Sequence, residues 1–368
     1  MAYFDNAATT KPYPEVVEVL AKASMDNFAN PSSVHSLGSR SKAMLEDSRD
    51  HISHMLGCKK NEIYFTSGAT ESTNWAMKGL GLPVILGQGD HKASLEGARQ
   101  SGQPYHILPI GKDGQIDIES LESQKLERAL LSLTLANNET GIIQDLEKSI
   151  KLARSKGYFV HVDAVQALGK MDLNIAEMDA DLLSLSSHKI HGPKGLGILY
   201  IKDGLEISPL IKGGGQERSL RSGTENLPAI LAFEKALEIT LEDLEDKIAY
   251  TKGLRDLMEE EILKSISHTR INGKDQKRLP SISNMSFKGL DSSQILMLLD
   301  MKGYQLSAGS ACSSGAIEKS HVLKAMGLSD DYIKGSIRAS LDPSNTREEV
   351  LAFVEALRHI IGSLRAKA

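Results

Sequence analysis

Short apolar segments alternate with helix-like polar stretches through the first two thirds of the chain, and this alternation restricts its fold more than any other feature. Apolar runs of this length are typical of buried strands, whereas stretches such as 145–156 have the pattern of amphipathic helices. Strands that alternate with helices favour a mostly parallel sheet with helices on both faces. The predicted strands are 62–66, 83–86, 106–110, 129–135, 159–162, 182–185 and 197–201.

The last third of the chain has a different pattern, which predicts a smaller α+β domain. Residues 226–266 form a long charged amphipathic stretch, which we expect to be helical and broken near Gly253. The elements expected after it are a strand at 284–287, a helix at 292–301, a strand at 335–341 and a helix that begins near Thr346.

A length of 368 residues allows two domains. We predict a large domain over 14–250 and a small domain formed by 1–13 and 251–368. The composition is that of an ordinary soluble protein, and a net charge of -5 gives no sign of a nucleic-acid or membrane surface.

The sequence contains neither an apolar run close to the roughly 20 residues that span a bilayer nor the pattern of a signal peptide. Two cysteines, Cys58 and Cys312, do not suggest a disulfide framework, and they fit a reducing cytoplasm. The histidines and cysteines do not have the spacing of a metal site.

Polar side chains follow three of the predicted strands, at Asn138, Asp163 and Lys189. Ligands of parallel sheets bind beyond the carboxyl ends of the strands. A lysine removed from water there has a lowered pKa, and its free amine forms Schiff bases with carbonyl compounds, pyridoxal phosphate above all. Such enzymes also need an acid to keep the pyridine nitrogen protonated, so Lys189 and Asp163 fit as a pair. The alternatives are an exposed lysine at a strand end and an aspartate that caps a helix.

Lys189 has one competitor for the Schiff base. Lys194 lies in a Gly-Pro-Lys-Gly turn, where it is expected to stay solvated and to keep its ordinary pKa. Ser186 and His188 flank Lys189 and are suited to bind a phosphate. A second phosphate cradle is predicted at 66–74, where hydroxyls and small residues join a strand to a helix that begins near Ala69 or Thr70. The simpler interpretation of that segment is a turn with a helix cap.

Four further residues are candidates for the same site. His91 precedes a probable helix and is suited to stack on a cofactor ring and to move protons, although a lone histidine is more often structural. Gln166 lies one turn beyond Asp163, within reach of the same ligand. Cys312 lies among small residues, which suits a nucleophilic thiol, although many cysteines are buried and inert. Arg338 interrupts a strand-like run, where an arginine often binds a carboxylate, and its alternative is a surface arginine.

Eight ordered motifs together resemble the pyridoxal-phosphate-dependent cysteine desulfurases of the NifS/IscS-like type, in the class V aminotransferase group. The similarity runs nearly from end to end. The motifs lie at 3–10, 30–35, 66–74, 137–141, 161–166, 186–195, 221–224 and 309–312.

This resemblance implies the pyridoxal-phosphate-dependent transferase fold of type I and a homodimer. It implies that Lys189 holds the cofactor aldehyde and that Cys312 takes sulfur from L-cysteine as a persulfide, leaving L-alanine. It assigns the acceptor of the sulfur to a protein such as an iron–sulfur scaffold or a tRNA-thiolation protein. The resemblance also implies that Asp163 pairs with the pyridine nitrogen of the cofactor, that Gln166 binds its phenolic oxygen, and that His91 stacks on its ring and transfers protons. Asn138 would contact both cofactor and substrate, and Arg338 would bind the substrate carboxylate. The residues implied to bind the phosphate are Ala69, Thr70, Ser186, His188 and the second subunit's Thr224.

Three rival interpretations remain. A selenocysteine lyase would share the same geometry. Another aminotransferase-fold enzyme would have no need of the thiol of Cys312. A non-catalytic binding subunit would be expected to lack the lysine or the cysteine, and this chain has both.

Overall fold

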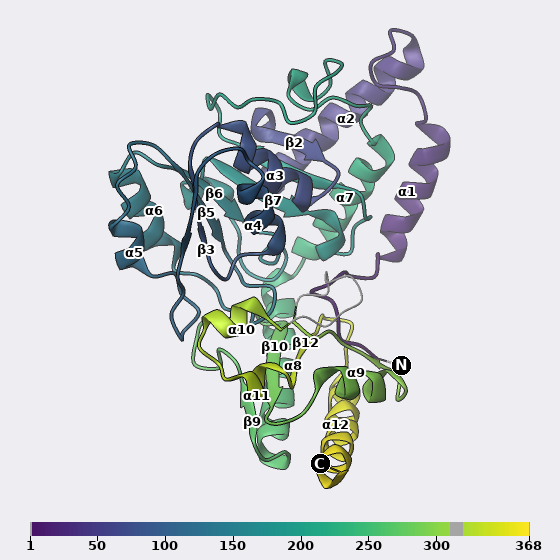
Figure 1. Ribbon diagram of the computed structural model, residues 1–368. Coiled ribbons are helices and arrows are strands. Elements are labelled where there is room, and N and C mark those ends of the chain that lie inside the picture. The colour runs from purple at the N-terminus through teal and green to yellow at the C-terminus, as the bar shows by residue number, and fades with distance from the viewer. Residues whose placement is uncertain (1, 310–318, 368) are drawn as a thin grey trace.

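A seven-stranded sheet forms the centre of the molecule (Figure 1), in a computed structural model that describes residues 2–309 and 319–367. The strand order is β2-β8-β7-β6-β5-β3-β4. Strand β8 runs antiparallel to both of its neighbours, and the other neighbouring pairs are parallel. The strands are β2 (Ile63–Thr66), β3 (Val84–Gly87), β4 (Tyr105–Leu108), β5 (Leu130–Thr134), β6 (Phe159–Asp163), β7 (Leu182–Ser186) and β8 (Gly197–Ile201). Each strand that the apolar runs predicted is therefore confirmed.

Helices cover both faces of this sheet, so most of its strands are buried on both faces. Strands β2, β3, β5, β7 and β8 are buried along their whole length, whereas the edge strand β4 is partly exposed. The helices of this part are α1 (Pro14–Asp26), α2 (Ser36–Met55), α3 (Ala69–Gly79), α4 (Lys92–Arg99), α5 (Ile118–Glu122), α6 (Leu146–Ser155) and α7 (Leu227–Leu241). Helix α7 packs against both α1 and α2.

The lower part of the molecule in Figure 1 holds a three-stranded antiparallel sheet, of order β12-β10-β9. Beside it, β1 (Ala2–Tyr3) pairs with β11 (Tyr304–Gln305), so the start of the chain joins this part. A separate buried cluster includes Phe4, Met258 and Phe353. The remaining elements are α8 (Leu244–Ser265), β9 (Thr269–Ile271), β10 (Ile282–Phe287), α9 (Ser292–Asp300), α10 (His321–Ala325), α11 (Asp330–Ile333), β12 (Ser336–Ser340) and α12 (Arg347–Lys367).

The long helical stretch is broken at a different place from the one that its glycine suggested. Helix α7 ends at Leu241 and α8 begins at Leu244, with Asp243 in the left-handed region at a φ of 48°. The amino group of Lys247 donates hydrogen bonds to the carbonyls of Ile239 and Glu242 and so satisfies the end of α7. Gly253 lies inside α8, and a Cβ there would meet open space. The prediction of a break near Gly253 was therefore wrong.

The largest buried cluster, around the central sheet, is separate from the cluster that includes Phe4. The larger cluster also includes Val322 and Ile333, from α10 and α11, and α8 runs through residue 250 without interruption. The exact division into 14–250 and 1–13 with 251–368 stays a prediction. Within the described residues, none of the helices is both long and apolar enough to cross a membrane.

Candidate active site

A cavity of about 480 Å³ lies at the carboxyl ends of β5, β6 and β7. This is the edge of a parallel sheet at which ligands bind. The structure brings most of the predicted site residues together there. Those that line the cavity are Ala69, Thr70, His91, Asn138, Asp163, Gln166, Ser186, His188, Lys189 and Arg338.

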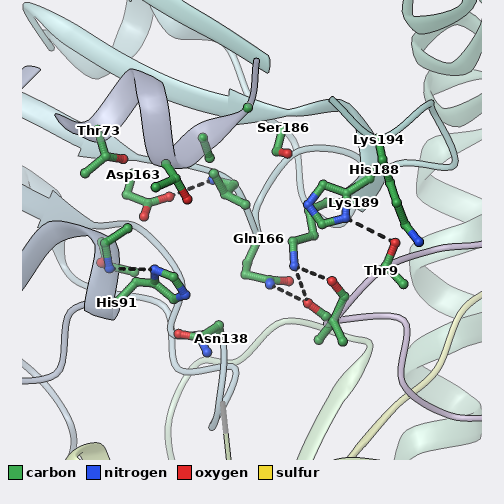
Figure 2. A pocket seen from close by; sticks show the side chains of 18 of the residues that line it. Thr9, Thr73, His91, Asn138, Asp163, Gln166, Ser186, His188, Lys189 and Lys194 are labelled. Atoms are coloured by element: carbon green, nitrogen blue, oxygen red, sulfur yellow. Dashed lines mark hydrogen bonds between the residues drawn. The ribbon is translucent and has the colours of Figure 1, made fainter. Parts of the chain in front are cut away.

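Lys189 is placed by the single turn Ser187–Lys189 that directly follows β7. Its amino group donates hydrogen bonds to the carbonyl oxygens of Ala7, at 2.8 Å, and Ala8, at 2.7 Å. Figure 2 shows these hydrogen bonds as dashed lines from the Lys189 amine, beside Gln166. Lys194 lies at the edge of the same cavity but is exposed, as expected. Lys189 is therefore the lysine whose amine is held within the site.

Asp163 is the last residue of β6, and only 9% of its surface is exposed. Burial raises its pKa to about 6, although the charge of Lys189 and a hydrogen bond from the Val165 N–H, at 3.1 Å, oppose that shift. In Figure 2 Asp163 and His91 lie on one side of the site, and Lys189 and Gln166 lie on the other. A cation placed beside Asp163 would stabilise its ionised form.

Gln166 is fixed by two partners. Its Nε2 donates to the carbonyl oxygen of Ala7 at 2.9 Å, and its Oε1 accepts from the amino group of Lys170 at 2.9 Å. The carbonyl of Ala7 thus receives hydrogen bonds from both Gln166 and Lys189. Sequence reasoning missed Ala7, Ala8 and Lys170, because a backbone carbonyl carries no residue-type signal and an isolated lysine carries little.

His91 caps the N-terminus of α4, where its Nδ1 accepts a hydrogen bond from the Ala93 N–H at 3.1 Å. Burial lowers its pKa to about 4, and the positive charges of Lys189 and His321 contribute to that shift. The imidazole is therefore neutral at pH 7. Because Nδ1 accepts, Nε2 carries the proton and is the nitrogen left to donate.

One wall of the cavity is suited to an anion. Ala69 and Thr70 are the first residues of α3, and their amides lie at the positive end of that helix. Ser186 and His188 line the same cavity, and Nδ1 of His188 lies 3.1 Å from Oγ1 of Thr9. Burial lowers the pKa of His188 to about 4, with the charge of Lys189 as the next contribution.

A glycine of β8 allows this close approach of α3. A Cβ on Gly197 would lie only 2.7 Å from the Cα of Gly68, the residue that caps α3. That distance is far below van der Waals contact, so a side chain at this position would push the start of α3 away from the strand.

Arg338 comes from β12, in the smaller part, and is only 1% exposed. Its Nη2 forms an ion pair with Oδ1 of Asp5 at 2.8 Å, and its Nη1 donates to the backbone carbonyl of Asn138 at 2.8 Å. Its Nε is buried and has no hydrogen-bond partner among the described residues. The alternative of a surface arginine is therefore wrong.

Two predicted residues remain to be accounted for. Thr224 is exposed and does not line it. Cys312 lies outside the described residues. The segment of Thr224 is nevertheless tied to the cavity wall, because Arg221 forms an ion pair with Glu71, with Nε and Oε1 2.8 Å apart. Glu71 lines the cavity and was missed, since a glutamate in the first turn of a helix is common.

A strained turn precedes that segment. Glu217, Arg218 and Ser219 have φ angles of 44°, 57° and 66°, in the left-handed region that ordinary side chains disfavour. The carboxylate of Glu217 binds the guanidinium of Arg49 at 2.7 and 2.8 Å and also accepts from the Phe65 N–H at 2.8 Å. These buried contacts of Glu217 hold the turn in place. The described part of the chain contains no cluster of histidine, cysteine and carboxylate residues that would hold a metal ion.

A lysine and a carboxylate that line one cavity with a helix N-terminus, at the edge of a parallel sheet, are typical of pyridoxal-phosphate enzymes. The family model that matches residues 2–353 is described as Aminotransferase class-V. The cysteine desulfurase IscS of Methanosarcina thermophila is 40% identical over 374 residues, which cover 99% of this chain and 92% of that protein. A cysteine desulfurase of Trichormus azollae is also 40% identical, with coverage of 99% and 94%.

The solved structures agree with this. A protein described as NifS-like superposes with a TM-score of 0.92 and 35% identity over 99% of this chain and 100% of that one. A structure described as SspA in complex with cysteine has a TM-score of 0.81 and 31% identity over 94% of this chain and 100% of that one. The chain therefore belongs to the class-V aminotransferase family, among its cysteine desulfurases.

Proposed function

We propose that this enzyme uses pyridoxal 5'-phosphate to convert L-cysteine to L-alanine and that it collects the sulfur as a persulfide on Cys312. The observation that carries the proposal is the amino group of Lys189, held by two backbone carbonyls inside a cavity that also contains Asp163. The cysteine complex of a protein 31% identical to this chain supports the choice of substrate.

The residues of the cavity fit this cofactor. Lys189 would hold its aldehyde, Asp163 would face the pyridine nitrogen, and Gln166 would donate to the phenolic oxygen. The phosphate would lie at the start of α3, against Ala69, Thr70, Ser186 and His188, with Thr224 of the partner subunit in a homodimer. Bound pyridoxal phosphate supplies the electron sink that allows the Cα–H and Cβ–Sγ bonds of the substrate to break.

The chain's own groups would bind the substrate and move its protons. Arg338, with its unpartnered buried Nε, would bind the carboxylate, and Asn138 would contact both cofactor and substrate. Lys189, once free, would take the proton from Cα, and the neutral His91 would help to move protons. The Cys312 thiolate would attack the substrate sulfur. A sulfur–sulfur bond then forms, and the electron pair of the broken Cβ–Sγ bond goes to carbon, which gains a proton.

The persulfide would pass its sulfur to an acceptor protein, such as an iron–sulfur scaffold or a tRNA-thiolation protein. Two curated relatives described as cysteine desulfurase IscS, from Methanosarcina thermophila and Dictyoglomus turgidum, support this class of sulfur donor. We propose that the enzyme works in the cytoplasm, consistent with cysteines that need no disulfide.

The test combines an absorbance spectrum with two product assays. Purified protein supplied with pyridoxal phosphate is expected to show a visible band that L-cysteine changes, to form alanine, and to release sulfide when dithiothreitol is present. Lys189→Ala should lose the band. Cys312→Ala should keep the band and lose the sulfide, because the cofactor site is intact and the sulfur acceptor is missing.

Cys58 provides the matched control. Burial raises the pKa of this thiol to about 12, so it is not a thiolate at neutral pH, and Cys58→Ala should behave as the wild type. A wild-type protein without the visible band, even with added cofactor, would overturn the proposal. A clear preference for selenocysteine over cysteine would replace it with a selenocysteine lyase.

A further inference from the structure

A second lysine lies behind the proposed cofactor site. Lys170 is in the turn after β6, four residues beyond Gln166, and its amino group donates to Oε1 of Gln166 at 2.9 Å. It also borders a second, smaller cavity of about 40 Å³, whose lining includes Lys189 as well. Lys170 does not line the main cavity, so any effect that it has on a ligand there must pass through its neighbours.

The contact with Lys170 settles how the Gln166 amide points. The carbonyl of Ala7 can only accept, so the amide nitrogen of Gln166 must face it, and Oε1 must face Lys170. The amine of Lys170 donates to that oxygen whether or not it is protonated. Of the two hydrogens on Nε2, one binds Ala7, and the other is available to a ligand of the main cavity. Without Lys170 the amide oxygen would lose this partner.

The surroundings of Lys170 are rich in positive charge. Its pKa is lowered to about 7, mainly by burial and also by the charges of Lys189 and Arg338, which Asp342 opposes. The titratable and charged groups that face this region are Tyr13 before α1, Lys189 and His188 after β7, His191 in the next turn, Lys247 of α8, Arg338 of β12 and Asp342 beyond it. Asp342 is the one carboxylate among them.

We propose that Lys170 is a positioning residue for the proposed cofactor site, where its amine orients the Gln166 amide and its positive charge opposes protonation of the nitrogen of Lys189. The inference rests on the proposed function for its purpose. The effect of the Lys170 charge on Lys189, however, does not require the cofactor and can be tested in the apoprotein. Because its pKa is about 7, Lys170 gains or loses its charge near neutral pH.

The first test uses apoprotein. Brief treatment with formaldehyde and cyanoborohydride modifies only unprotonated amines, so the extent of Lys189 labelling, measured by peptide mass spectrometry across neutral and alkaline pH, reports its protonation. Lys170→Met removes a like charge that the wild type carries only up to about pH 7, so the labelling midpoint should rise above that of the wild type and should lie roughly one pH unit above that of Lys170→Arg. Lys170→Arg keeps the charge at every pH, and its midpoint should stay at or below that of the wild type.

The second test uses protein loaded with pyridoxal phosphate and follows the visible band against pH. Lys170→Met should raise the midpoint of this titration, and Lys170→Arg should restore it. The small cavity beside Lys170 gives the longer side chain room. In a Gln166→Ala background the effect of Lys170→Met on the band should shrink, because the amide that Lys170 orients is gone.

Lys247→Met is the matched control, because Lys247 borders the same small cavity but bonds the end of α7. Its midpoints should equal those of the wild type. Equal midpoints for Lys170→Met, Lys170→Arg and wild type would overturn the inference. Absence of the band from wild-type protein would overturn the proposed function alone, since the labelling of apoprotein still decides whether Lys170 acts on Lys189.

Discussion

Replacement of Asp163 by asparagine should stabilise the apoprotein while it weakens cofactor binding. The carboxyl is buried, and its folded-state pKa is about 6, against an ordinary value of 3.8. The folded protein therefore holds this proton more tightly than the unfolded chain does, so ionisation of the carboxyl disfavours folding. The penalty is absent below the unfolded pKa, grows as pH rises, and is complete above the folded pKa. The pKa difference of about two units corresponds to a loss of about 3 kcal/mol in the free energy of unfolding at pH 8.

The measurement is urea unfolding of apoprotein at two pH values. Asp163→Asn should be more stable than wild type by about 3 kcal/mol at pH 8 and by roughly half of that near pH 5, where the folded wild type is mostly protonated. Added pyridoxal phosphate should stabilise wild type strongly and the variant much less, because a ligand stabilises a protein in proportion to the logarithm of its affinity.

Asp90 offers the matched comparison. It is also buried, with a pKa that burial raises to about 7, but it does not line the main cavity. Asp90→Asn should stabilise the apoprotein in the same way and respond to pyridoxal phosphate as the wild type does. An Asp163→Asn apoprotein no more stable than wild type at pH 8 would refute the burial argument. An undiminished response to pyridoxal phosphate would refute the role of Asp163 beside the cofactor.

Three further substitutions test other parts of the site. Glu217→Gln should cost about 3–5 kcal/mol of stability in thermal or urea unfolding, because it removes the buried anion of Arg49 and leaves the guanidinium only the partly exposed Glu46; a loss below ~1 kcal/mol would contradict this. Gly197→Ala should cost about 1–3 kcal/mol and weaken pyridoxal phosphate binding in a titration, since the new Cβ would displace Gly68; unchanged affinity would show that the start of α3 does not bind the phosphate. Arg338→Lys should raise the KM for L-cysteine about tenfold, or ~1.4 kcal/mol, and keep the visible band, because a lysine cannot make the two-pronged contact; an unchanged KM would remove Arg338 from the substrate site.

The strands and the edge of the site were predictable because local sequence determines both. The strands are short apolar runs that helices cover on both faces, so their pattern needs no tertiary information. Asp163 and Lys189 follow such runs directly, and parallel strands place their carboxyl ends at one edge. The break between α7 and α8 was mislocated because a glycine in a helix costs only about 1 kcal/mol relative to alanine and is tolerated. Asp243, where the break lies, carries no such visible signal.

Most of the contacts missed from the sequence are long-range. The carbonyls that hold Lys189 belong to residues about 180 positions earlier, and Glu71 meets Arg221 150 positions later. Neither pair has a spacing that a local pattern could reveal. Lys170 is close to Gln166 in the sequence, but a single lysine after a strand is ordinarily a solvated residue, and only its depressed pKa within the fold distinguishes it.

The segment that follows β1 connects the two parts of the molecule. Phe4 is buried in the smaller core, and Asp5 is paired with Arg338 of β12. Two and three residues later, the carbonyls of Ala7 and Ala8 hold the amine of Lys189. The chain between Asp5 and Ala7 is too short to absorb a large displacement. A shift of the smaller core relative to the central sheet must therefore move the carbonyls that hold the lysine. The release of the Lys189 amine and the movement of the smaller core are thus coupled.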